Sequence, residues 1–200
     1  MRRSLFAFAT ILVIAALAIG CGTPVASTEP GVAMPALGSY PTSAPTGATT
    51  PPLTPVEQLG VTGVPLTIDI DQYRLIVDGL VEQPLTLTYE EILALPTVTM
   101  VPRLECPGFF VDYAEWTGPL VRLILDKAGI KPGAESVIFS DSSGYDQMLS
   151  LQSALADNIY LAHTLYGKPL PALHGYPLRL VAANHLGNYW VKWLTHIEVR

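Results

Sequence analysis

The chain has 200 residues, half of them apolar, which fits one domain of ordinary size with a substantial core. Its 11 basic and 17 acidic residues give a formal net charge of −6 at pH 7. Nucleic-acid binding depends on clustered positive charge, so no nucleic-acid partner is expected for this acidic chain.

The N-terminus has the features of a secretory signal. Two arginines precede an apolar run, Leu5–Ile19, which is shorter than the roughly 20 residues of a membrane-spanning helix and suits a signal peptide. Small residues then lead to Cys21 in a pattern similar to the bacterial lipobox, whose cysteine is lipidated and becomes the mature N-terminus. We expect residues 1–21 to be a lipoprotein signal peptide. The alternative is an ordinary signal peptide in which Cys21 is incidental.

These features predict an exported protein. The start Arg2-Arg3-Ser4-Leu5-Phe6 also resembles a twin-arginine export signal, which directs folded proteins across the membrane. A lipid on Cys21 would hold the protein to the membrane. The expected location is therefore the outer face of the cytoplasmic membrane, on its periplasmic or extracellular side.

Residues 22–60 are rich in proline, threonine and serine and contain no lysine or arginine. Such a composition buries too little apolar surface to offset the entropy lost on ordering. We expect residues 22–60 to be a disordered tether between the membrane and the domain. The alternative is an irregular arm packed on the domain.

Residues 61–200 are expected to form the single domain. The strands predicted there span 73–79, 85–87, 97–105, 136–140, 147–151, 178–183 and 189–199. A capping box of Thr88 and Glu91 starts a short helix over 89–95, and a second helix over 119–128 ends at a glycine. Many strands with only short helices indicate an α+β fold rather than a doubly wound sheet.

Cys106 is the only cysteine of this domain and follows the strand predicted over 97–105. If Cys21 carries lipid, Cys106 has no disulfide partner. The commonest fate of such a thiol is burial as a small hydrophobic side chain. It could also be a soft ligand for a redox metal, or a reactive thiolate, although no second cysteine lies nearby to resolve a thiol intermediate.

Two cationic segments follow about seventy residues later. One is His174-Gly-Tyr-Pro-Leu-Arg179 and the other is Gly187-Asn-Tyr-Trp-Val-Lys192-Trp193. The planar guanidinium of Arg179 suits a phosphate, and Lys192 offers a mobile point charge. Each side chain alone is more often a surface charge or a structural residue. Together with Cys106, they indicate an anionic cofactor beside a sulfur-ligated metal.

Cys106 and the motif His-x-x-Pro-x-Arg, with a lysine thirteen residues after the arginine, carry a family resemblance. Residues 70–200 resemble the molybdopterin-binding domain of the sulfite oxidase family, which includes the catalytic subunit of periplasmic methionine sulfoxide reductase. The resemblance implies a sulfite-oxidase-like fold of mixed β-sheets with short helices. It also implies an oxidoreductase that depends on molybdopterin, the molybdenum cofactor.

The resemblance further implies the site residues. Cys106 would be the catalytic residue and the protein ligand of molybdenum. The cofactor-binding residues would be Asp141, His174, Arg179, Trp190, Val191 and Lys192. Ser140 could serve in place of Asp141.

The implied reaction is two-electron oxygen-atom transfer on a small sulfur compound or another oxyanion or S-oxide. A separate protein would donate or accept the electrons. The loop Pro107–Tyr113 is aromatic and acidic, so a neutral S-oxide is favoured over sulfite, with Arg103 the nearest candidate cation and Tyr113 and Tyr145 candidate donors. The alternative is a cofactor-less, lipid-anchored binding or scaffold module on the same fold.

Overall fold

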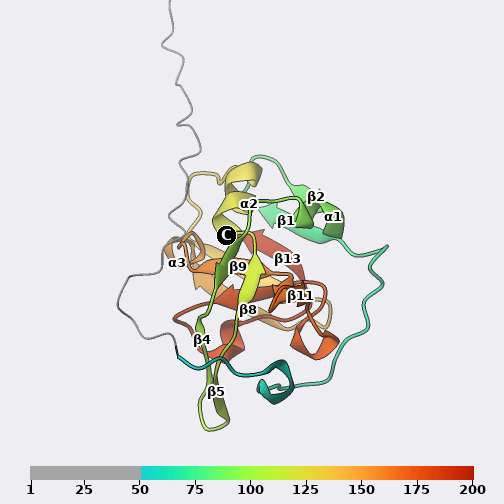
Figure 1. The fold of residues 1–200 in the computed structure, drawn as a ribbon. Coiled ribbons are helices and arrows are strands. Elements are labelled where there is room, and N and C mark those ends of the chain that lie inside the picture. Colours follow the sequence, from blue (N-terminus) through green and yellow to red (C-terminus); the bar gives the residue numbers. More distant parts are fainter. Residues whose placement is uncertain (1–50) are drawn as a thin grey trace, which may run out of the picture. The chain divides into compact units, whose positions relative to one another are not determined.

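The computed structural model describes residues 51–200 (Figure 1). The expected signal peptide and residues 22–50 of the expected tether lie outside the described residues. Within them, thirteen strands form four sheets, accompanied by three short α-helices and three 3-10 turns. No helix in this part of the chain combines the length and apolar character needed to span a membrane.

The largest sheet has five strands in the order β2-β1-β13-β7-β8. Their bounds are Leu85–Leu87 for β2, Leu75–Gly79 for β1, Leu194–Val199 for β13, Ser136–Asp141 for β7 and Asp146–Ser150 for β8. Strand β1 pairs in parallel with β13, and the other neighbours are antiparallel. Alternate side chains of β1, Leu75 and Val77, are fully buried, as expected for a sheet with one face on the core.

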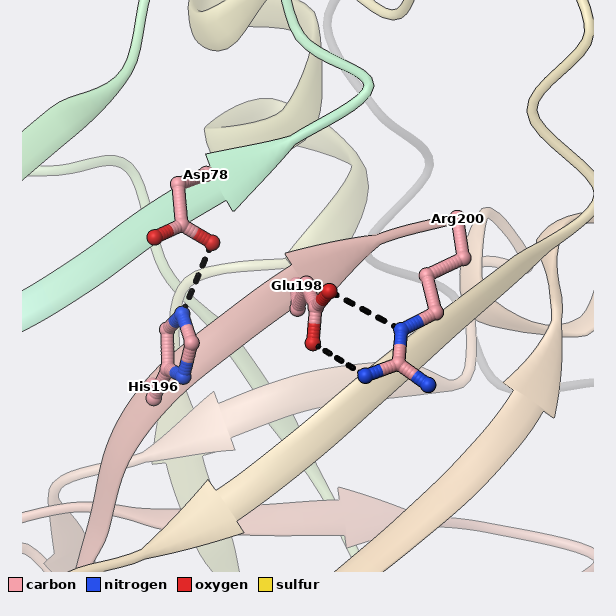
Figure 2. A network of polar contacts seen from close by, with 4 residues as sticks. All are labelled: Asp78, His196, Glu198 and Arg200. Carbon is pink, nitrogen blue, oxygen red and sulfur yellow. Dashed lines mark hydrogen bonds and ion pairs between the residues drawn. The ribbon is translucent and has the colours of Figure 1, made fainter.

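Polar side chains connect β1 and β13 on the solvent side of this sheet (Figure 2). His196 lies 2.8 Å from Asp78, and Arg200 donates two hydrogen bonds of 2.9 and 2.8 Å to Glu198. Exposed pairs of this kind contribute about 0–1 kcal/mol each. Burial of the opposite face therefore contributes most of the sheet's stability.

Three smaller sheets complete the domain. One has the order β11-β10-β6-β3, and two others pair β12 with β9 and β4 with β5. The bounds are Lys168–Pro169 (β11), Thr164–Leu165 (β10), Trp116–Gly118 (β6), Val98–Met100 (β3), Arg179–Ala182 (β12), Ile159–Ala162 (β9), Arg103–Cys106 (β4) and Phe110–Tyr113 (β5). Every residue of β9 and β12 is buried, so this pair lies in the core.

The helices are short, as the sequence predicted. They are α1 (Tyr89–Leu93), α2 (Val121–Ala128) and α3 (Leu151–Ala154). Both hydrogen bonds of the predicted capping box at α1 are present, at 3.2 and 2.8 Å. Helix α2 begins two residues later than expected, because Leu120 is extended and forms a β-bridge with Tyr160.

Two predicted strands are divided in the structure. The segment 97–105 forms β3 and β4, and Cys106 is the last residue of β4. The strand predicted over 189–199 is wrong in its first half, where the 3-10 turn η3 (Gly187–Tyr189) leads into an irregular stretch. Trp193 in that stretch has a positive φ of 54°, which a strand does not allow. Only its second half forms β13.

Residues 51–66, here called the N-terminal arm, lie against the domain. The arm includes the 3-10 turn η1 (Val56–Gln58) and passes the β4–β5 hairpin (Figure 1). Thr54 N–H donates to the Tyr113 carbonyl (2.8 Å), and Gly60 N–H donates to the buried carboxylate of Asp112 (2.7 Å). These bonds hold the arm beside the hairpin.

The arm corrects one expectation. Residues 51–60 were expected to belong to the disordered tether, whereas they pack on the domain. Leu59 is buried in the core, and the Tyr166 hydroxyl donates to the Thr54 carbonyl (2.6 Å). Composition could not show this, because two apolar residues, Val56 and Leu59, and a few hydrogen bonds to residues distant in the sequence hold the segment.

Candidate active site

Two adjoining cavities lie between the N-terminal arm, the β4–β5 hairpin and the segment after β12. The larger has a volume of about 520 Å³ and the smaller about 30 Å³. Both are lined by Thr62, Cys106, Gly187, Trp190 and Lys192. The two cavities thus share walls, and Cys106 belongs to each.

Cys106 ends β4 and is paired with Phe110 across the hairpin. Burial raises the pKa of its thiol, the charge of Arg179 opposes that shift, and the charge of Asp112 adds to it. A reactive redox thiol needs a lowered pKa. A raised pKa disfavours Cys106 as a free redox thiol, whereas a metal that binds the sulfur would itself displace the proton.

Arg179 lines the smaller cavity and is buried, with an exposed fraction of 4%. Its only hydrogen bond within residues 51–200 is to the carbonyl of His174 (3.2 Å), and its Nε has no partner there. Its guanidinium carbon lies 4.5 Å from the ring centroid of Trp116. Burial lowers its pKa to about 10. A buried cation without a carboxylate needs an anion in the cavity.

Two more cofactor-binding candidates lie beside Arg179. Burial, reinforced by the charges of Arg179 and Lys192, lowers the pKa of His174 to about 4, so its ring is neutral at pH 7. Burial also lowers the pKa of Lys192 to about 8. The ammonium group of Lys192 donates to the carbonyls of Thr62 and Leu173. Its partners are thus neutral carbonyls. Like Arg179, Lys192 has no carboxylate partner within residues 51–200.

Asp141 lines the larger cavity at the end of β7. Its Oδ1 accepts hydrogen bonds from Ser143 N–H and Oγ–H (both 2.7 Å) and from Tyr145 N–H (3.0 Å). One carboxylate oxygen thus shapes the turn, and Asp141 rather than Ser140 reaches the cavity. The Tyr145 hydroxyl also reaches it and donates to the Asn188 carbonyl (2.6 Å).

The two remaining cofactor-binding candidates, Trp190 and Val191, differ in their position relative to the cavities. Trp190 lines both cavities, and its ring centroid lies 5.4 Å from the guanidinium carbon of Arg179. Val191 is fully buried and lines neither cavity. Its carbonyl accepts a hydrogen bond from Leu180 N–H (2.8 Å). The structure therefore brings six of the seven predicted site residues to the cavities and places the Val191 side chain in the core.

The loop after Cys106 has one aromatic residue on each cavity. Phe109, with an exposed fraction of 83%, lines the larger cavity, and Phe110 lines the smaller one. Arg103 forms an exposed ion pair with Glu105, and neither Arg103 nor Tyr113 lines a cavity. Arg103 thus adds no positive charge to the walls.

The sequence did not identify the part of the site contributed by the N-terminal arm. Thr62, Gly63, Val64 and Leu66 line the larger cavity. They carry no catalytic side chain, and their place depends on contacts with residues about fifty to 130 positions away. Gly187 was missed for a similar reason, because a glycine offers no side-chain chemistry.

The donors of the two cavities match an anionic cofactor with a sulfur-ligated metal. The smaller cavity combines a sulfur atom with two cations and a neutral imidazole. In the part of the chain from residue 51 onward, no three His, Cys, Asp or Glu side chains come together as a metal site. Soft metals bind thiolate. Cys106 is the one thiol among the residues that line the two cavities.

The comparisons with known proteins agree with this site. Residues 61–200 match the family described as the oxidoreductase molybdopterin binding domain. The chain is 35% identical over 138 residues to the uncharacterized oxidoreductase YuiH of Bacillus subtilis, covering 68% of this chain and 69% of that protein. It is 30% identical over 120 residues to the putative protein-methionine-sulfoxide reductase subunit YedZ1 of Azospira oryzae, covering 60% and 46%.

Among solved structures, the sulfane dehydrogenase SoxCD of Paracoccus pantotrophus has a TM-score of 0.63 and 28% sequence identity. The match covers 67% of this chain and 39% of that chain. The chain thus spans about two thirds of the Bacillus protein and less than half of the other two.

The fold and the site define a molybdopterin-dependent oxidoreductase domain of the sulfite-oxidase-like type. The chain belongs to the oxidoreductase molybdopterin-binding domain family, and its cofactor is molybdopterin. The predicted α+β fold of mixed sheets and short helices is confirmed.

Proposed function

We propose that this protein catalyses a two-electron oxygen-atom transfer on a small sulfur compound, with Cys106 as the protein ligand of molybdenum. The observation that carries the proposal is the meeting of Cys106 with Arg179, His174 and Lys192 at one cavity wall. These residues come from β4, β12 and two loops far apart in the sequence. Chance burial would not leave two cations there without carboxylates.

The side chains divide the work of holding the cofactor. Bound molybdopterin supplies the redox metal and its other sulfur ligands. Arg179 and Lys192 bind anionic groups, since both are cations with only carbonyl partners among residues 51–200. Neutral His174 and the free oxygen of Asp141 offer hydrogen bonds to polar ring atoms. Trp190 supplies an apolar wall, whereas Val191 lies in the core, where both its backbone groups are bonded within the protein, and makes no direct contribution to the cavities.

The walls of the larger cavity favour a neutral substrate. Its charged side chains are Asp141 and Lys192, whose charges oppose each other. Several apolar residues line the rest: Val64, Leu66, Pro107, Phe109, Trp190 and Trp193. A sulfite dianion would need more positive charge than these walls supply. A neutral S-oxide is the substrate class that fits, and electrons would come from a separate protein.

Metal analysis tests the proposal. Protein from a host that makes the cofactor should contain about one molybdenum per chain, because binding requires the folded site. Cys106→Ser should abolish the metal and leave the domain folded by circular dichroism. Ser153→Ala, on the surface helix α3, serves as the control and should keep the metal. Wild-type protein without molybdenum would favour the alternative, a cofactor-less binding module.

A further inference from the structure

Gly187 lies directly against the sulfur atom of Cys106. It begins η3 and lines both cavities. A β-carbon at this position would lie 2.4 Å from Cys106 Sγ, and 3.2 Å from the Glu105 carbonyl oxygen and from Leu104 Cδ1. Since Cβ atoms do not approach other heavy atoms within 3.0 Å, a side chain at position 187 excludes the observed position of the sulfur.

The backbone conformation does not explain this glycine. Gly108 and Gly175 have φ values of +79° and +104°, in the region that favours glycine, whereas the φ of Gly187 lies outside it. An alanine could therefore adopt the backbone of Gly187 without strain. What the site requires here is space for the sulfur.

The turn η3 cannot simply move away from Cys106. The carbonyl of Asn188 accepts the hydrogen bond of the Tyr145 hydroxyl (2.6 Å). Trp190, which follows the turn, is buried beside Arg179. A cysteine side chain has a single torsion before its sulfur, so a displaced sulfur must take another staggered position and point elsewhere.

We propose that Gly187 is a positioning residue that fixes the direction of the Cys106 sulfur at the metal site. The residue acts through Cys106 and carries no chemistry of its own. This inference rests on the proposed function, because the direction of the sulfur matters to the reaction only if Cys106 ligates the metal.

A double-mutant cycle on cofactor-free protein tests the steric contact. Gly187→Ala should lower the melting temperature by about 5 °C, because overpacking destabilises a protein and this domain is of moderate size. In a Cys106→Ala background the same substitution should lower the melting temperature by at most about half as much, since the clashing sulfur atom is gone. Equal losses in the two backgrounds would overturn the inference.

Metal content and absorption spectra test the consequence for the site. In a cofactor-competent host, Gly187→Ala should lose most of its molybdenum or shift the sulfur-to-molybdenum charge-transfer band. Leu186→Ala is the matched control, because Leu186 precedes Gly187 in the same turn, is 44% exposed and lines neither cavity. It should keep both properties.

The outcomes separate the two proposals. If wild-type protein holds molybdenum and Gly187→Ala keeps the same content and spectrum, the positioning role is wrong and the proposed function stands. If wild-type protein holds none, both proposals fail.

Discussion

Arg179 illustrates how a binding site costs stability. Its guanidinium is buried beside the rings of Trp116 and Trp190 without a carboxylate within residues 51–200. Cation–π contacts of about 1–2 kcal/mol recover only part of the cost of dehydrating a buried charge. The cofactor-free domain therefore contains a charge that only a bound anion can compensate.

Arg179→Met should stabilise the cofactor-free protein and destroy its function. Methionine can fill the space beside the two tryptophans without a buried charge. We expect the melting temperature of the cofactor-free protein to rise by about 3 °C and molybdenum content to fall to background. Arg200→Met, which removes an exposed charge just after β13, is the control and should change neither value measurably. A fall in melting temperature would contradict the compensation argument.

His174 makes the cofactor-free domain sensitive to acid. Its pKa is about 4 in the folded state, against the ordinary histidine value of 6.5, so the unfolded chain binds the proton more tightly. Stability due to the neutral ring is complete above pH 6.5 and is lost as the pH falls towards 4. A tenfold change in proton affinity is worth about 1.4 kcal/mol. The titration of this ring should therefore lower the free energy of unfolding at pH 4 by about 3 kcal/mol.

Urea unfolding between pH 7 and pH 4 measures this loss. His174→Gln keeps a neutral polar side chain. Its free energy of unfolding should fall by about 3 kcal/mol less than that of the wild type between pH 7 and pH 4. Identical declines in wild type and His174→Gln would show that His174 is not the sensitive group. His163, whose pKa burial also lowers, contributes to the remaining slope in both proteins.

Among the elements, the N-terminal arm is the one that covers the site. Its Gly60 N–H binds the buried Asp112 carboxylate on β5, and its Thr62 carbonyl accepts from Lys192. The arm thus holds Lys192, the proposed cofactor-binding cation, and forms one wall of the larger cavity.

Asp112→Ala should loosen the arm. A hydrogen bond to a charged group contributes about 1.5–3 kcal/mol, and its loss should speed amide hydrogen exchange throughout residues 54–66. Exchange in α2 should stay at the wild-type rate. Asp146→Ala, which removes an exposed carboxylate on β8, is the control. Unchanged exchange in the arm would show that other contacts hold it.

The elements also show what the sequence could predict. Local signals identified the capping box of Thr88 and Glu91, and short apolar runs followed by turn residues identified β1 and β7. Strand β9, Ile159–Ala162, was missed because all its residues are buried and no alternation marks it. The run 189–193 was assigned to a strand because aromatic and β-branched residues favour strands. The structure instead turns this run around the cavities.

At the site too, some contributions could be predicted from the sequence and others could not. Cys106, His174, Arg179 and Lys192 could be predicted because their side chains have distinctive chemistry at a recognisable spacing. The contributions of Gly187 and of the arm could not, since they consist of empty space and backbone atoms. Such contributions become visible only when segments distant in the sequence are placed side by side.

At the scale of the whole molecule, the N-terminal sequence predicts attachment to a membrane. Cys21→Ser should remove the proposed lipid, so the protein should move from the membrane fraction to the soluble fraction after cell disruption. Cys106→Ser is the matched control and should remain in the membrane fraction. Wild-type protein that is already soluble would contradict lipid attachment.

The position of β13 has a consequence for how the protein is made. This strand lies inside the five-stranded sheet, between β1 and β7, yet it is formed by residues 194–199. On the ribosome, β1 emerges more than a hundred residues before the partner that it needs, so the nascent chain cannot complete the sheet until residues 194–199 have been made. If residues 1–21 are a signal peptide, as the sequence predicts, they reach the export machinery while the domain is still unfinished. A pathway that threads unfolded chains could then take the protein at once, whereas one that carries folded, cofactor-loaded enzyme must wait until residues 194–199 have been made.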